Sequence, residues 1–142
     1  MLAQITEFSA NHPLLVGAFV ALLAVLFLNE LKHATQKFKS LLPADAVQMM
    51  NNEDVVFLDV REPAETAAGK ITRAVQIPAG SVAERIKELE KHREKPVIVY
   101  CKTGSRSSIA CSALSNGGFE KVYSLNGGIL AWQEAHLPVV KK

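Results

Sequence analysis

An apolar run near the N-terminus limits what this chain can fold into. The segment from Leu14 to Leu28 reads LLVGAFVALLAVLFL and contains no charged or polar side chain. A helix of this kind in a soluble domain would need protein packed around its whole circumference. The chain has 142 residues in all, too few after the run to supply such a layer. We therefore expect the run to lie outside the globular fold.

A membrane-spanning helix is the interpretation that we favour for this run. Its fifteen residues, at about 1.5 Å each, cover only ~22 Å of a hydrocarbon core that is ~30 Å thick. Extension to residues 13–31 brings the helix close to a full span, with Asn11 as its cap and Pro13 in its first turn. A cleaved signal peptide is the alternative, but residues 1–12 contain no Lys or Arg and no Ala-x-Ala site follows.

The distribution of positive charge predicts the orientation of this helix. All 16 Lys and Arg residues follow the apolar run, beginning with Lys32, Lys37 and Lys39. Positive residues favour the cytoplasmic side of a span. The sequence therefore predicts a single-pass membrane protein whose globular domain lies in the cytoplasm. Its expected parts are a short extracytoplasmic N-terminus (1–12), a transmembrane helix (13–31), a basic linker (32–40) and a globular domain (41–142).

Short strands alternate with short helices in the globular part. Val55–Leu58 and Val97–Tyr100 are continuous apolar runs, typical of strands buried on both faces of a parallel sheet. Further strands are expected at 74–77 and 122–125, and helices near 43–50, 64–68, 81–95, 107–116 and around Trp132. The alternation predicts an α/β domain with a mostly parallel sheet flanked by helices. Sites in such sheets gather at the carboxyl ends of the strands.

The end of the 97–100 strand carries the candidate nucleophile. Cys101 follows the strand and opens a short polar loop, which consists of Lys102, Thr103, Gly104, Ser105 and Arg106. Inward backbone N–H groups and the start of the next helix favour an anion at this place. We therefore expect the Cys101 thiol to ionise readily and to act as a nucleophile. Gly104 would allow an unusual backbone conformation, and Arg106 would add a permanent cation.

The helix after this loop is expected to bury one face. Four residues at helical spacing form that face, namely Ile109, Ala110, Ala113 and Leu114. Cys111 lies among them and is expected to be a small core residue. Ten residues separate it from Cys101, too far along a loop and helix for a disulfide without local unfolding.

The pattern Cys101-x-x-Gly104-x-Arg106 after an apolar strand resembles the active-site loop of rhodanese-type sulfurtransferases. Further segments occur in the order seen in single rhodanese domains: Leu58-Asp59-Val60-Arg61, Gly69-x-Ile71, Ala74-x-x-Ile77-Pro78 and Gly127-Gly128-x-x-Ala131-Trp132. Together they cover about residues 41–138. The chain departs from the family pattern at Lys70, where His is common, and at Thr66, where an aromatic residue is common.

The resemblance implies a two-step sulfur transfer. The Cys101 thiolate takes a sulfur from a small anionic donor such as thiosulfate, holds it as a persulfide and passes it to a thiol or protein acceptor, or to cyanide. The resemblance assigns donor binding to the loop: Lys102 attracts the anion, Thr103, Gly104 and Ser105 contribute backbone N–H groups, and Arg106 contributes its charge. Arg106 has a second, compatible interpretation, in which it ties the loop to a carboxylate.

Asp59 and Arg61 are expected to support the loop. Asp59 follows the 55–58 strand and therefore lies at the same type of strand end as Cys101. A salt bridge, with the loop or with Arg61, is the role we favour for Asp59, because a carboxylate that capped the thiolate would weaken anion binding.

Composition excludes several other classes of protein. The net charge is only +2 and basic residues do not alternate with aromatic ones, so nothing indicates nucleic-acid binding. Two cysteines do not make a disulfide framework, and their spacing matches no metal site, so we expect a reducing compartment and neither metal nor cofactor.

Two other functions remain open. Phosphatases and arsenate reductases of a related fold use a Cys-x5-Arg loop, one residue longer than the spacing from Cys101 to Arg106. A non-catalytic membrane adaptor would use the domain only to bind a partner. The combination of Cys101, Gly104 and Arg106 argues against that interpretation, because a binding module does not need it.

Overall fold

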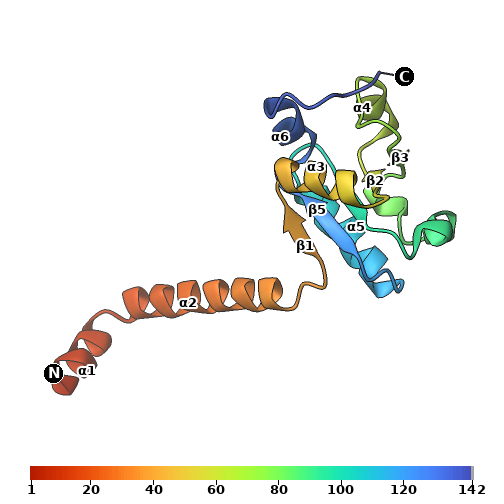
Figure 1. The fold of residues 1–142 in the computed structure, drawn as a ribbon. Coiled ribbons are helices and arrows are strands. Elements are labelled where there is room, and N and C mark those ends of the chain that lie inside the picture. Colours follow the sequence, from red (N-terminus) through yellow and green to blue (C-terminus); the bar gives the residue numbers. More distant parts are fainter. Residues whose placement is uncertain (142) are drawn as a thin grey trace. The chain divides into compact units, whose positions relative to one another are not determined.

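The computed structural model describes the backbone of residues 1–141, and its side chains except those of residues 2–6 and 32–34 (Figure 1). The chain divides into two compact units, which begin at Met1 and at Lys37. The first contains helices α1 (Leu2–Asn11) and α2 (Pro13–Ala34). The second contains the α/β domain, and Lys142, the last residue of the predicted domain, lies outside the described residues.

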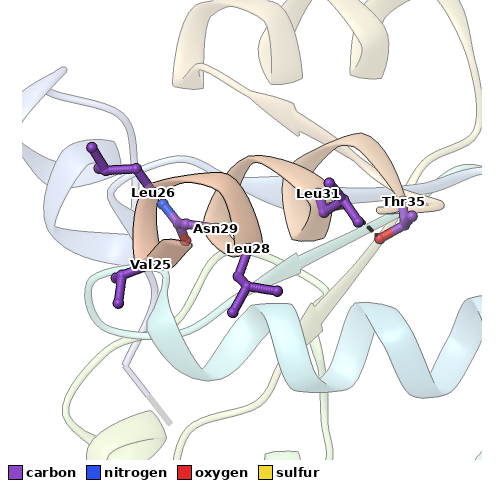
Figure 2. Close-up of a pocket in the computed structure, with 6 residues that line it drawn as sticks. All are labelled: Val25, Leu26, Leu28, Asn29, Leu31 and Thr35. Atoms are coloured by element: carbon purple, nitrogen blue, oxygen red, sulfur yellow. Dashed lines mark hydrogen bonds between the residues drawn. The ribbon is translucent and has the colours of Figure 1, made fainter. Parts of the chain in front are cut away.

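Helix α2 contains the apolar run. Within the part of the chain that the structure describes, one segment is long and apolar enough to cross a membrane. It is the Pro13–Leu31 part of α2. Figure 2 shows the side chains near its C-terminal end, where Val25, Leu26 and Leu28 are accompanied by Asn29, and where the Thr35 hydroxyl donates to the Leu31 carbonyl at 2.9 Å. The prediction that Asn11 caps this helix is wrong, because Asn11 is the last residue of α1.

Five parallel strands form the sheet of the second unit, in the order β1-β5-β4-β2-β3. The strands are β1 (Lys39–Leu41), β2 (Val56–Asp59), β3 (Val75–Gln76), β4 (Val97–Tyr100) and β5 (Val122–Leu125). Every residue of β2 and β4 is buried, which explains why both strands are almost continuously apolar. The predicted α/β fold with a parallel sheet is confirmed.

Helices cover both faces of this sheet (Figure 1). They are α3 (Pro43–Asn52), α4 (Pro63–Ala67), α5 (Ser105–Asn116) and α6 (Gly128–Glu134), with 3-10 helices η1 (Ala79–Ser81) and η2 (Ile86–His92). Successive strand residues alternate between two cores. Val99 packs with Leu114 of α5 in one core, whereas Ile98 packs with Trp132 of α6 in the other.

Three local expectations are wrong. Residues 39 and 40 of the predicted linker belong to β1, an edge strand whose exposed Lys39 and Ser40 give no apolar signal. The 81–95 segment forms turns and the 3-10 helix η2; Leu89 is buried as expected, but apolar spacing over so few residues does not distinguish 3-10 from α geometry. Helix α5 begins at Ser105, and Ile109, predicted to face the core, is 64% exposed.

Candidate active site

The loop from Cys101 to Gly104 connects the buried strand β4 to helix α5. Gly104 precedes the first residue of α5 and has a φ of +111°, a left-handed conformation that L side chains rarely adopt. An added Cβ would be 3.6 Å from its nearest neighbour, the Gly127 nitrogen, so the backbone angle and not space requires glycine here. The conformation predicted for Gly104 is therefore confirmed.

Backbone N–H groups surround the sulfur of Cys101. The Gly104 N–H donates to Sγ at 3.0 Å. Burial by itself raises the pKa of the Cys101 thiol, but the N–H groups of Ser107, Gly104, Thr103 and Arg106 outweigh it and bring this pKa below its ordinary value. The residue is fully buried, so the thiolate is stabilised by fixed dipoles and not by water.

Arg106 is tied to a carboxylate on another helix. Its Nη1 and Nη2 donate to the two carboxylate oxygens of Glu65 at 2.8 and 2.9 Å. Glu65 lies on α4 and also accepts the Glu62 N–H at 3.1 Å, within a capping box. The hydrogen bonds from Arg106 are the main cause that lowers the pKa of Glu65 to about 2. The structure thus contains the carboxylate tie that was one of the two interpretations of Arg106, and anion binding by this side chain stays a prediction.

Asp59 and Arg61 form a buried ion pair at the end of β2. Arg61 Nη2 lies 2.6 Å from Asp59 Oδ2, and its Nε donates to both carboxylate oxygens. The same Nη2 donates to the Gly69 carbonyl at 2.6 Å, and Nη1 to the Glu65 carbonyl at 3.3 Å. Arg61 therefore fixes the backbone on both sides of the α4 C-terminus, and the position of the carboxylate that holds Arg106 depends on it.

Helix α6 contacts the backbone of the cysteine loop directly. The N–H groups of Ile129 and Leu130 donate to the carbonyls of Cys101 and Lys102 at 2.9 and 3.3 Å. Gly128 has a φ of +60°, and an added Cβ would lie 2.5 Å from the Cys101 oxygen. This glycine, which the sequence indicated only as part of a turn and a motif, lets α6 approach closely enough to hold both carbonyls.

A pocket of about 250 Å³ lies beside the loop. It is lined by Arg61, Glu65, Ala68, Gly69, Lys102, Ile129, Leu130 and Gln133. The pocket brings Lys102 and Arg61 together, whereas Thr103 of the loop and Ser105, the first residue of α5, are exposed and lie outside its lining. Glu65 is a site residue that sequence reasoning missed, because 41 residues separate it from Arg106 and no local pattern links them.

Cys111 is part of the core. Its side chain is fully buried, and both cysteines are free. Burial, together with the nearby Cys101, raises the pKa of Cys111 to about 12. Among the residues whose side chains the structure describes, no three His, Cys, Asp or Glu side chains are grouped as they would be to hold a metal ion.

The fold is thus a parallel α/β domain in which backbone N–H groups surround one cysteine at the end of a central strand. Residues 42–135 match the Rhodanese-like domain family. The chain is 33% identical over 139 residues to the uncharacterized protein YibN of Escherichia coli K12, with 97% of each chain covered. It is 41% identical over 93 residues to a sulfurtransferase of Allochromatium vinosum, over 66% of this chain and 85% of that protein.

A solved structure agrees with this match. The crystal structure of a rhodanese-related protein from Thermoplasma volcanium has a TM-score of 0.67 at 35% identity, over 74% of this chain and all of that one. The chain therefore belongs to the rhodanese-like family.

Proposed function

We propose that this protein is a sulfurtransferase that carries a sulfane sulfur as a persulfide on Cys101. The observation that carries the proposal is the ring of backbone N–H groups that favours the ionised form of a lone thiol. The family has a role in sulfur transfer, and the relative from Allochromatium vinosum is named a sulfurtransferase.

The proposed reaction has two displacement steps. The Cys101 thiolate attacks the outer sulfur of thiosulfate, a new S–S bond forms, and the S–S bond of the donor breaks, so that sulfite leaves with the bonding electron pair. The anionic outer sulfur of the persulfide is then attacked by an acceptor thiolate or by cyanide. The Cys101–sulfur bond breaks, and the pair of electrons restores the thiolate. No proton, metal or cofactor is required for this balance.

The residues around Cys101 have different proposed roles in binding the donor and the persulfide. The N–H groups that favour the Cys101 thiolate are also placed to favour a persulfide, which carries the same charge. Lys102 is exposed at the pocket beside the loop, where it would attract an anionic donor. Arg106 would act mainly on loop shape, because Glu65 already neutralises much of its charge.

A second candidate is a non-catalytic binding domain, which the full burial of Cys101 favours. A buried sulfur reacts with a donor only when the residues over the loop move, whereas a binding module has no such requirement. A phosphatase activity has no comparable support, since the loop is one residue shorter than the Cys-x5-Arg loop of those enzymes.

We also propose where the protein is located in the cell. Helix α2 is apolar and long enough to anchor the chain in a membrane, and the basic residues that follow it support an orientation with the catalytic domain in the cytoplasm. The proposed partners are a small anionic sulfur donor and a thiol or protein acceptor. A reporter fused to the C-terminus is expected to give a cytoplasmic signal, and an extracytoplasmic signal would overturn this orientation.

The test is intact-mass measurement of the full chain in detergent after treatment with thiosulfate. We expect a gain of about 32 Da, one sulfur atom, that disappears on addition of cyanide and is absent from Cys101→Ser. The Cys111→Ala variant should gain the same mass as the wild type. A folded protein that gains no sulfur from thiosulfate, and none from a small persulfide donor, would favour the binding domain.

A further inference from the structure

Two buried serines outside the predicted loop connect the sheet to the cysteine site. The Ser107 hydroxyl donates to the Gly104 carbonyl at 2.6 Å, and its oxygen lies 2.8 Å from the Ser124 hydroxyl oxygen. Ser107 is fully buried in the first turn of α5, and Ser124 is 7% exposed on β5. Ser124 pairs in register with Val99 of β4, the strand that leads into Cys101.

The direction of these hydrogen bonds follows from counting protons. A serine hydroxyl has one hydrogen, and that of Ser107 is used on the Gly104 carbonyl. In the contact between the two serines, Ser124 must therefore be the donor and Ser107 the acceptor. The result is a one-way chain from Ser124 through Ser107 to the carbonyl of Gly104.

This chain of hydrogen bonds ends at the carbonyl of Gly104, the residue that precedes α5. Glycine adopts many backbone angles at little cost, so the residue itself does little to fix the orientation of the peptide that follows it. A rotation that turned the Gly104 carbonyl toward Sγ would replace favourable dipoles by a partial negative charge next to the thiolate. The hydrogen bond from Ser107 holds this carbonyl in place and keeps the N–H groups around the sulfur.

We infer that Ser107 and Ser124 are positioning residues, and that Ser124, from the neighbouring strand, helps to hold Cys101 as a thiolate by fixing the orientation of the Gly104 peptide. The inference deepens the proposed function, but its test requires neither a sulfur donor nor an acceptor.

A common helix feature offers a matched control. Serine side chains often bond a carbonyl three or four residues earlier in their own helix, and such a bond alone has no special role. Ser112 makes one of this kind on α5, to the Ser108 carbonyl at 3.0 Å, and it is exposed. Ser107 differs because its oxygen also accepts from a second structural element.

The experiment measures alkylation of Cys101 by iodoacetamide as a function of pH in the full chain. Trypsin cleaves at Lys102 and Arg106, so mass spectrometry reads Cys101 and Cys111 on different peptides. In Ser107→Ala we expect the rate at pH 7 to fall about tenfold, because the thiol ionises at higher pH, with the limiting rate at high pH unchanged. In Ser124→Ala we expect a fall of about threefold, because Ser107 keeps its bond to Gly104.

The double variant tests the connection. If Ser124 acts through Ser107, then Ser107→Ala/Ser124→Ala behaves like Ser107→Ala alone, whereas independent effects would multiply. Ser124→Thr keeps the hydroxyl and should restore the wild-type profile, and Ser112→Ala should leave it unchanged. Urea unfolding establishes that each variant is folded; if Ser107→Ala is not, the Ser124 variants decide. A wild-type profile in folded Ser124→Ala, or multiplied effects in the double variant, would overturn the inference.

Discussion

The two cysteines of this chain lie ten residues apart and are both fully buried, yet their acidities move in opposite directions. The pKa of Cys101 falls below its ordinary value, whereas that of Cys111 rises to about 12. Four backbone N–H groups, from the loop and the first turn of α5, act on the sulfur of Cys101, whereas the sulfur of Cys111 lies 3.7 Å from the Tyr123 carbonyl oxygen. The comparison teaches that burial raises the pKa of both thiols, and that the backbone N–H groups around Cys101 reverse this direction at one of them.

The largest expected difference is between two variants, each of which replaces one of the two thiols. Cys101→Ser should lose sulfur transfer from thiosulfate to cyanide, with a fall in rate of at least about 10³, because no other group in the site can hold the sulfur. Cys111→Ala should keep the rate within about threefold and lose mainly stability, by about 1–2 kcal/mol, since it removes only a buried core atom. Colorimetric detection of thiocyanate measures the rates; equal losses in both variants would contradict the comparison.

A second expected effect comes from Gly104. Gly104→Ala places a side chain at a φ of +111°, so the backbone must shift and the N–H groups around Sγ lose their alignment. We expect the rate of sulfur transfer at pH 7 to fall by about 10- to 100-fold and the rise of the rate with pH to move to higher pH.

Gly80→Ala is the control for this change. Gly80 has no positive φ, and no atom lies within 4 Å of an added Cβ. The free energy of unfolding and the activation free energy of sulfur transfer should therefore each stay within about 0.5 kcal/mol of the wild-type values. An unchanged pH profile in Gly104→Ala would show that the loop conformation does not set the acidity of Cys101.

A smaller effect is expected from the carboxylate that holds Arg106. The folded pKa of Glu65, about 2, lies below that of the unfolded chain, so the unfolded state binds more protons at acid pH. The stabilisation is therefore present at neutral pH and is lost as the pH falls through the range from about 4.3 to about 2. Urea unfolding between pH 7 and pH 2 should show this loss in the wild type and a weaker pH dependence in Glu65→Gln.

A control variant distinguishes the contact between Glu65 and Arg106 from an ordinary ion pair on the surface. Glu88→Gln removes the exposed partner of Arg85, which lies outside the site, and should leave the urea unfolding curve close to that of the wild type at each pH. If Glu65→Gln and Glu88→Gln gave the same acid unfolding curves, Glu65 would have no special role in the loop.

The sequence predicted what local patterns encode. The apolar run of β4, the following Cys101 and the glycine at position 104 are contiguous, so strand, thiol and left-handed turn could be inferred together. Contacts between distant segments could not be inferred. Glu65 reaches Arg106 across 41 residues, and Ser124 reaches Ser107 across 17, and only the packing of the elements brings them together.

The other differences between the predicted and the observed structure occur at an edge strand and at a surface position. Strand β1 has two exposed residues out of three, so it lacks the apolar pattern that marked β2 and β4. Ile109 is an apolar residue at helical spacing that nevertheless remains 64% exposed, because its helix turns another face to the sheet. Apolar periodicity predicts that a helix has a buried face, but it does not fix the edges of that face.

The most direct test of the account is the pH profile of iodoacetamide alkylation at both cysteines in one sample of the wild-type protein. We predict that Cys101 reaches half of its limiting rate below the pH of an ordinary thiol, about 8.5, and that Cys111 remains unreactive until the protein unfolds or the pH nears 12. A Cys101 that reacts only above pH 9 in the folded protein would contradict the claim that the surrounding backbone N–H groups lower the pKa of its thiol.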